Sequence, residues 1–168
     1  SWPHTMSKPN GSLAYPNLGG ALLERDVEVQ VFDAAVGDEH DDLSTTFYSP
    51  VVLPTGLLRS GVSDERILEA VADSHIVGIT SIFTDQETMV LAAAKLIKQA
   101  YPDKLIVSGG VNARSRLERF LDNGIDLVCL SEAERTIQLV ADEVGRGGRN
   151  FGDVPAVAFR KDGKTVLN

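Results

Sequence analysis

Hydroxyl-bearing residues and glycines follow three apolar runs of the sequence, where they could hold a ligand. Hydroxyl groups can donate hydrogen bonds to a polar ligand tail, and a residue without a side chain lets a ring or a ribose approach the backbone. The helix N-terminus expected after the third run favours groups that accept hydrogen bonds. The residues with these properties are Thr80, Thr84, Gly109, Gly110, Ser131 and Glu132. Their types are compatible with ligand binding.

The same polar residues also have a purely structural interpretation. Thr84 and Ser131 each stand three residues before a glutamate, which is the spacing of a capping box at a helix start, and Ser115 has this spacing as well. A capping residue contributes about 1 kcal/mol to stability, and Gly109-Gly110 would then form only a tight turn. Capping and binding can coexist, because a capped helix start is rigid.

Catalysis by this chain finds little support in the sequence. Glu132 and Glu134 could be taken for paired acid–base carboxylates, but nothing near them offers a nucleophile or a substrate pocket. Two acidic residues at a helix start also complement the helix dipole. We therefore predict no catalytic residue.

Metal and dinucleotide sites are also disfavoured. Residues 38–42 form an acidic run, but the run lacks the glycine and the terminal glutamate of an EF-hand, so we expect a solvated charge run. Asp33 could hold a ribose, yet no Gly-x-Gly-x-x-Gly turn precedes it. His4 has no partner ligands in its segment. We predict that Cys129 is a buried core thiol, and a lone cysteine excludes a self-contained iron–sulfur cluster.

Length and charge limit the remaining classes. The 168 residues suit one domain, and 43% hydrophobic residues are ordinary for a globular protein. The net charge of -8 argues against a nucleic-acid partner, which needs clustered Lys and Arg. No apolar run approaches the ~20 residues that span a bilayer. With no signal peptide in view, the cytoplasm is the expected compartment.

The elements that position the polar residues follow from apolar periodicity. Ile76-Val77-Gly78-Ile79 and Leu105-Ile106-Val107 have the composition of buried strands, and a helical pattern between them stops at Pro102. Residues 126–130 form the next buried strand, with helical patterns on either side. This alternation predicts an α/β fold, a Rossmann-like, flavodoxin-type doubly wound parallel sheet. Ligands bind at the carboxyl ends of such strands.

Four further expectations concern the rest of the chain. Residues 27–33 alternate and predict a strand with one wet face. Residues 34–61 are expected to pack over the sheet edge or to form one wall of a pocket. Residues 156–167 predict a C-terminal hairpin around Asp162-Gly163. The helix near Leu18 should follow a first strand, but residues 1–17 contain no strand pattern.

Taken together, these motifs resemble the cobalamin-binding domain at the N-terminus of many radical SAM enzymes. The resemblance covers roughly residues 12–168 and depends on an ordered set of individually weak motifs. Those motifs are Leu18-Gly19-Gly20-Ala21-Leu22-Leu23, residues 27–33, Val77-Gly78-Ile79-Thr80 with Thr84, Val107-Ser108-Gly109-Gly110-Val111-Asn112-Ala113, Asp126-Leu127-Val128, Glu132-Ala133-Glu134-Arg135-Thr136, and residues 153–160. Within the family, the anaerobic magnesium-protoporphyrin IX monomethyl ester oxidative cyclase type is the nearest match that we would name.

The resemblance implies a cofactor, a set of contact residues and a partner domain. Cobalamin would be bound by Thr80, Ser81, Thr84, Gly109, Gly110, Asn112, Ser131 and Glu132. Residues 1–150 would be the cobalamin-binding domain, and residues 151–168 a hairpin and linker toward a catalytic domain absent from this chain. S-adenosylmethionine and a [4Fe-4S] cluster would belong to that radical SAM domain of the same polypeptide. Methyl transfer or substrate oxidation would occur there.

The sequence departs from the family pattern in three places. Ser131-Glu132-Ala133-Glu134 stands where Gly-Glu-Gly-Glu is frequent, and Asn112 stands where histidine is frequent. The Asp-x-His-x-x-Gly motif of the mutase branch is absent, so the resemblance offers no histidine as the lower cobalt ligand. Two alternatives stay open: a cofactor-free flavodoxin-like interaction or signalling domain, and a small hydrolase or nucleotide-sugar enzyme, which would need a nucleophile elbow or a phosphate-binding glycine loop.

Overall fold

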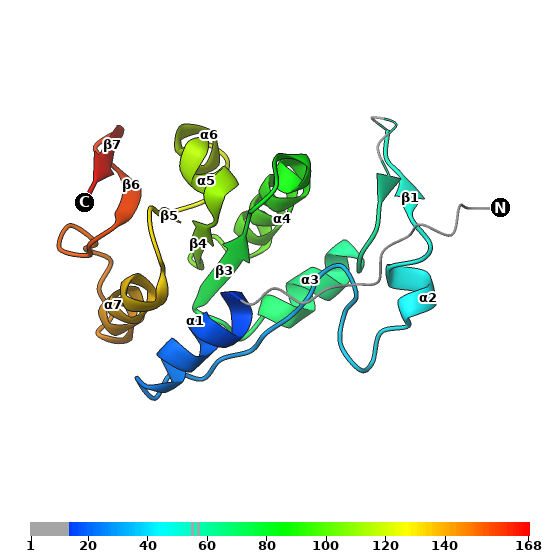
Figure 1. Ribbon diagram of the computed structural model, residues 1–168, viewed down its shortest axis with the longest axis horizontal. Coiled ribbons are helices and arrows are strands. Elements are labelled where there is room, and N and C mark those ends of the chain that lie inside the picture. The colour runs from blue at the N-terminus through cyan, green and yellow to red at the C-terminus, as the bar shows by residue number, and fades with distance from the viewer. Residues whose placement is uncertain (1–13, 55, 57) are drawn as a thin grey trace.

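A five-stranded sheet forms the centre of the computed structural model, which describes residues 14–54, 56 and 58–168. Three strands run parallel, namely β3 (Ile76–Thr80), β4 (Leu105–Gly109) and β5 (Leu127–Cys129). The antiparallel strands β6 (Val157–Lys161) and β7 (Lys164–Leu167) extend the sheet beyond β5. The strand order is β3-β4-β5-β6-β7 (Figure 1).

Helices cover both faces of this sheet, as the alternation of patterns predicted. One face carries α1 (Ala14–Leu23) and α7 (Glu134–Gly145), whose apolar residues pack with those of β4 and β5. The other face carries α3 (Asp64–Val71), α4 (Glu87–Ala100) and α6 (Leu117–Leu121). Because successive strand residues point to opposite faces, each strand contributes to both layers of core.

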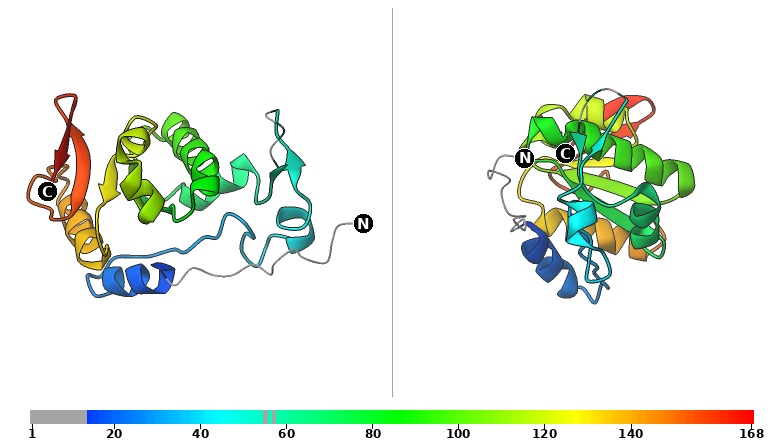
Figure 2. Two further views of the ribbon diagram at one scale, coloured as in Figure 1. Left: turned by 45° about the horizontal axis from the view of Figure 1, so that its top comes forward. Right: turned by 90° about the vertical axis from the view of Figure 1, so that its right-hand side faces the viewer.

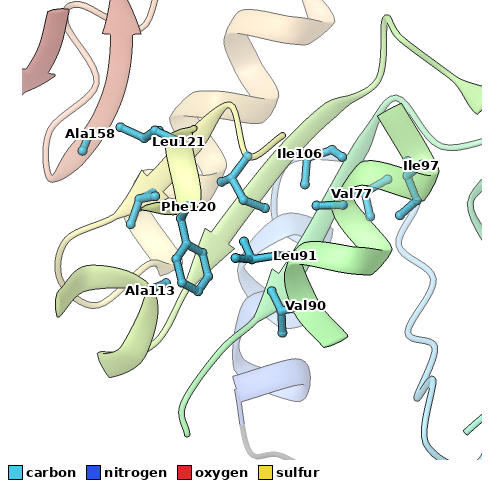
Figure 3. Close-up of a cluster of buried hydrophobic side chains, with 12 residues drawn as sticks. Val77, Val90, Leu91, Ile97, Ile106, Ala113, Phe120, Leu121 and Ala158 are labelled. Carbon is cyan, nitrogen blue, oxygen red and sulfur yellow. The ribbon is translucent and has the colours of Figure 1, made fainter. Parts of the chain in front are cut away.

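The packing between the sheet and α4 and α6 is shown in Figure 3. Val77 of β3 and Ile106 of β4 lie in the same buried cluster as Leu91 of α4 and Phe120 of α6. Ile106 and Phe120 are completely buried. This packing holds β3 and β4 in place against α4 and α6, and so positions the loops that follow the two strands.

The C-terminal hairpin forms as predicted. Residues Asp162 and Gly163 connect β6 to β7 with φ angles of 50° and 74°. Two consecutive positive φ angles are what the tightest hairpin turns require, and Asp-Gly tolerates them. β6 pairs with β5 from Leu127↔Phe159 to Cys129↔Val157, so the hairpin belongs to the main sheet.

Residues 27–33 do not form the predicted strand. Only an isolated bridge joins Asp33 to Gly37, and the side chain of Val31 is exposed. A strand is stabilised by its neighbour, and β3, the edge strand of the sheet, pairs only with β4 among the described elements. The predicted absence of a strand before α1 concerns mainly residues 1–13, which lie outside the described part of the chain.

Residues 34–61 contain a short helix, α2 (Leu43–Thr46), and a small hairpin of β1 (Val51–Val52) and β2 (Leu58–Arg59). This hairpin lies at the opposite end of the molecule from β6 and β7 (Figures 1 and 2). Ser63 caps α3 by accepting a hydrogen bond from the Arg66 amide, 3.2 Å away. No helix within the described ranges is long and apolar enough to cross a membrane.

Candidate ligand-binding site

The ends of β3 and β4 are joined by hydrogen bonds that begin at Ser81. Its amide donates to the Gly109 carbonyl at 2.8 Å, and its carbonyl accepts from the Asn112 and Ala113 amides at 3.2 and 3.4 Å. Asn112 Nδ2 donates to Ser81 Oγ at 2.9 Å. Ser81 is 0% and Asn112 3% exposed. Both predicted contact residues therefore lie beneath the surface, where they hold two loops together.

Gly110 permits this junction because of its backbone conformation. It has a φ of +103°, and a Cβ placed on it would stand 2.3 Å from the Ser81 carbonyl oxygen. No side chain fits at that distance. Gly110 precedes α5 (Val111–Ser115), a short helix that the sequence patterns did not predict. Gly109 has more room, because its nearest neighbour, Cys129 Cβ, would be 3.8 Å away.

The predicted capping boxes are wrong at Thr84, Ser115 and Ser131. Thr84 is the first residue of a 3₁₀ turn, η1 (Thr84–Gln86), and its side chain caps nothing. Ser115 ends α5 and donates a hydrogen bond to the Asn112 carbonyl. The N-cap of α7 is Ala133, which has no capping side chain, and the Ser131 hydroxyl reaches only the Glu132 carbonyl, at 3.4 Å.

Two threonine hydroxyl groups at this edge are available to a ligand, because Thr84 does not cap a helix and Thr80 makes no side-chain hydrogen bond in the described structure. Thr80 is partly buried and Thr84 is exposed, and neither hydroxyl has a hydrogen-bond partner in the described structure. Ser131 and Glu132 are exposed after β5. Because Thr80 is the Cα partner of Gly109 and β4 pairs with β5, the predicted residues lie at or just after the ends of three adjacent strands, along one edge of the sheet.

Three exposed apolar side chains lie at the same edge and were missed by the sequence analysis. Ile82 and Phe83 follow β3 and are 41% and 61% exposed, and Val111 begins α5 with 61% exposed. Exposed apolar groups beside a predicted site indicate a contact surface. The sequence did contain a signal for this apolar surface, because Ile82-Phe83 interrupts an otherwise polar loop after β3.

An open hollow of about 590 Å³ between α1 and α7 is a second feature that the sequence analysis missed. It is lined by Pro16, Asn17, Gly20, Ala21, Glu24, Glu134, Arg135 and Gln138. Gln138 joins the two helices by donating to the Ala21 carbonyl at 2.7 Å. A Cβ on Gly20 would meet nothing within 4 Å, so the hollow has room for a ligand group.

The two helices around this hollow run in the same direction. Gln138 contacts Ala21, and one turn further along Arg25 pairs with Asp142 at 2.9 Å. The first turns of α1 and α7 therefore lie side by side. α7 follows β5, so both helices start at the carboxyl edge of the sheet. The hollow is lined by Glu134 and Arg135 in the first turn of α7, shortly after Ser131 and Glu132 in the sequence.

A buried carboxylate, that of Glu87, links the segments that follow β3 and β4. Glu87, in the first turn of α4, lies 2.9 Å from Arg116 Nε and 2.5 Å from Arg119 Nε. Glu87 is 5% exposed, whereas both arginines are more open to solvent. This contact joins the segment after β3 to the junction of α5 and α6.

The acidic run at residues 38–42 is engaged with protein groups. Arg66 forms ion pairs with Asp38 and with Asp41, whose Oδ2 lies 3.2 Å from Arg66 Nε. The His40 amide and Arg66 hold the pKa of Asp38 below its ordinary value. In the described residues no group of three or more His, Cys, Asp or Glu side chains could hold a metal ion. Asp33 accepts a hydrogen bond from the Ala35 amide, as a loop carboxylate does.

Cys129 lies in the core, as predicted. It is 5% exposed, and burial raises the pKa of its thiol to about 11. The thiolate is the form that ligates metals and attacks electrophiles. Cys129 therefore takes no part in the chemistry of this edge.

Comparison with known proteins adds one curated relative and one fold. No protein-family model matches the chain. The chain is 33% identical over 170 residues to the cytidylyl-2-hydroxyethylphosphonate methyltransferase of Streptomyces wedmorensis, a match that covers 98% of this chain and 30% of the methyltransferase. The chain thus spans less than a third of the length of this relative.

Two solved structures of the radical S-adenosylmethionine methyltransferase TsrM from Kitasatospora setae match with a TM-score of 0.71 at 18% identity. The matches cover 95% of this chain and 27% and 26% of those chains. One structure contains tryptophan and a SAM analogue, and the other contains cobalamin and a [4Fe-4S] cluster. At this identity the likeness shows the fold, and it confirms the predicted Rossmann-like α/β class.

Proposed function

We propose that this domain binds cobalamin for a radical SAM methyltransferase of which it forms one part. The observation that carries the proposal is the match of nearly the whole chain to about a quarter of a methyltransferase that holds cobalamin. The single cysteine of this chain cannot hold the iron–sulfur cluster of that enzyme. Cobalamin is thus the one of its two cofactors for which this chain has suitable groups.

The residues at the carboxyl edge fit a large, flat and partly apolar guest. Ile82, Phe83 and Val111 offer hydrocarbon to a macrocycle, while the free hydroxyls of Thr80 and Thr84 offer hydrogen bonds to its polar periphery. The hollow between α1 and α7, open at the same edge, has room for the nucleotide tail. Ser81 and Asn112 support this surface from below.

Neither described histidine lies at this edge. His75 precedes β3, at the opposite edge of the sheet, and His40 is an exposed residue of the acidic run. We infer that neither described histidine would be a ligand to the cobalt. When bound, cobalamin would supply a cobalt-carried methyl group to chemistry in a catalytic domain of the same polypeptide.

The relatives favour methyl transfer over the oxidative cyclase type that the sequence suggested. Both names that the comparisons give are methyltransferases, and we propose that reaction class for the whole protein. The catalytic domain, its S-adenosylmethionine and its [4Fe-4S] cluster belong to the same proposal. A cytoplasmic location stays a prediction.

Cobalamin binding is tested directly by mixing the purified protein with excess hydroxocobalamin, desalting it and recording the visible spectrum. We expect about one corrin per chain, and a dissociation constant from equilibrium dialysis. The measurement is made on the 168-residue chain and on the full-length gene product. A folded full-length protein that retains no corrin would refute cobalamin binding and would favour a cofactor-free interaction domain.

A matched pair of substitutions tests whether the proposed edge is the binding surface. Phe83→Ala removes an exposed ring at the edge, and we expect cobalamin affinity to fall about tenfold with little change in stability. Leu167→Ala removes an equally exposed side chain (61% exposed, like Phe83) on β7. If both variants bind cobalamin as the parent does, the contact surface lies elsewhere.

A further inference from the structure

Two arginines near the junction of α5 and α6 share one buried carboxylate. Glu87 Oε2 lies 2.9 Å from Arg116 Nε, and Glu87 Oε1 lies 2.5 Å from Arg119 Nε. Because both Nε atoms contact the same carboxylate, the two guanidinium groups are neighbours. Glu87 is 5% exposed, and a carboxylate in such a place must be paired to stay ionised. The two arginines stabilise the buried charge, and the charge in turn holds both arginines in position.

Most hydrogen-bond donors of these two arginines have no protein partner. A guanidinium group carries five N–H donors, whereas a carboxylate has about four acceptor sites in all. In the described part of the chain, Glu87 is the only acidic residue that pairs with Arg116 or Arg119, and neither guanidinium has another hydrogen-bond partner there. Their side chains are 44% and 54% exposed. The remaining N–H groups are therefore available to a ligand.

Both arginines line an open hollow of about 380 Å³. The lining residues are Ser115, Arg116, Leu117, Glu118 and Arg119. The acidic residue of this lining, Glu118, is engaged by the C-terminal hairpin. Its Oε2 lies 2.7 Å from Arg160 Nη2, and its Oε1 accepts a hydrogen bond from the Thr165 hydroxyl at 2.7 Å. The hollow therefore offers guanidinium donors without a free carboxylate to occupy them.

We propose that Arg116 and Arg119 bind the phosphate or phosphonate group of a small-molecule ligand in this hollow. Two guanidinium charges against the one carboxylate of Glu87 leave a positive charge in excess, on a chain whose net charge is -8. Guanidinium groups bind phosphoryl oxygens through parallel pairs of N–H···O bonds. A phosphoryl group has three acceptor oxygens, enough for two arginines, whereas a carboxylate can be satisfied by one.

The position of the arginine pair separates it from the hollow between α1 and α7. Glu87 begins α4, which follows β3, so the pair lies near the carboxyl edge of the sheet. Residues of α4 and α6 pack on one face of the sheet, and residues of α1 and α7 pack on the other. A nucleotide tail between α1 and α7 would keep its phosphodiester on that other face. We therefore assign the phosphoryl group at the arginines to a separate molecule. This assignment rests on the proposed function, whereas the anion site itself does not.

Titration of the 168-residue chain with inorganic phosphate, in the absence of cobalamin, tests the anion site. The arginine Nε–H signals are followed by NMR at constant ionic strength, with chloride and acetate as reference anions. We expect saturable shifts of the Arg116 and Arg119 signals with a dissociation constant of about 1 mM, and similar binding of methylphosphonate. Shifts that do not saturate, or that chloride or acetate reproduces, would overturn the proposal.

A matched pair of substitutions locates the bound anion. Arg119→Gln removes one guanidinium group and leaves Arg116 to pair with Glu87, and it should raise the dissociation constant for phosphate about tenfold. Arg146→Gln removes the same charge from an arginine that is 68% exposed and pairs with Glu143, and it should bind phosphate as the parent does. Equal phosphate binding by the parent and Arg119→Gln would contradict the site.

A conservative variant covers the case in which Arg119→Gln does not fold, which circular dichroism reveals. Arg119→Lys keeps the charge beside Glu87 but loses the forked donor geometry. It should raise the dissociation constant for phosphate about fivefold. Unchanged binding in the lysine variant would show that charge alone attracts the anion, and would overturn a site built from two guanidinium groups.

Cobalamin affinity, measured by equilibrium dialysis, distinguishes the two sources of a phosphoryl group. Unchanged cobalamin affinity of the folded Arg119 variant, together with weakened phosphate binding, would support a separate phosphorylated ligand. A parallel loss of cobalamin affinity would overturn that assignment, and would identify the phosphodiester of cobalamin as the bound group. Because the phosphate titration contains no cobalamin, its outcome is independent of whether the domain binds cobalamin.

Discussion

Gly110 shows how a single residue determines the shape of the proposed site. Its positive φ lets the chain turn from β4 into α5 while passing within contact of the Ser81 carbonyl. That carbonyl then accepts hydrogen bonds from two amides of α5. The loops after β3 and β4 therefore keep their relative positions only if residue 110 has no side chain.

Replacing Gly110 with alanine should destabilise the domain and distort the edge. The Cβ would clash with the Ser81 carbonyl oxygen and hold alanine in a disfavoured φ region, which together should cost about 2–3 kcal/mol. Urea unfolding followed by circular dichroism measures the change. Gly109→Ala is the matched control, because its Cβ would have an ordinary 3.8 Å contact. Equal stability of the two variants would contradict the role assigned to Gly110.

At the scale of elements, the ion pairs of Glu87 join α4 to the junction of α5 and α6. The carboxylate is buried, and each of its two arginines comes from a segment that follows β4. Replacing the carboxylate with an amide leaves two guanidinium groups without their charged partner and puts an NH₂ donor where one acceptor oxygen stood, a loss that is moderated because both arginines reach solvent.

The substitution Glu87→Gln is expected to lower the free energy of unfolding by about 1–2 kcal/mol. Glu28→Gln changes the net charge by the same amount at an exposed residue outside the ion pairs, and should be neutral. Urea unfolding of both variants at low and at high salt provides the comparison. A neutral Glu87→Gln variant would mean that side-chain packing alone joins these helices.

The sequence predicted the buried strands well, because their apolar runs are short and bounded by turn residues. Ile76–Thr80 and Leu105–Gly109 form within two residues of the expected limits, and the Asp-Gly hairpin forms where its turn chemistry requires. These features depend on local sequence. The predicted strand at residues 27–33 does not form, because a strand also needs a neighbour and no strand of the described fold pairs with this segment.

The candidate site was predicted in part. The strand ends could be placed together because parallel strands share an edge: Thr80 and Gly109 end β3 and β4, and Ser131 follows β5. The burial of Ser81 and Asn112 could not be predicted, since it depends on the close approach of two loops distant in sequence. The capping boxes were predicted wrongly because a hydroxyl residue three positions before a glutamate also occurs in loops. At Glu87, ion pairs with Arg116 and Arg119 take the place of the expected contact with the helix start.

At the scale of the whole molecule, the groups that we propose to bind a ligand gather at one edge of the sheet. The exposed apolar residues after β3 and β4, the free hydroxyls and the hollow between α1 and α7 all lie there. The remaining surface carries most of the ion pairs. This arrangement suits a domain that presents a cofactor to another domain.

If the [4Fe-4S] cluster belongs to the catalytic domain, as proposed, this chain should assemble no iron–sulfur cluster. Cluster irons are held by several cysteine thiolates. The only cysteine here, Cys129, is buried in the core with a pKa raised to about 11. After anaerobic reconstitution with iron and sulfide, the desalted 168-residue chain should lack absorption near the cluster band and should contain no stoichiometric iron. The full-length gene product treated in the same way should acquire both.

Cys129→Ala serves as the control for adventitious iron, because it should behave as the parent chain does. Four irons per chain in the parent and none in Cys129→Ala would contradict the assignment of the cluster to another domain.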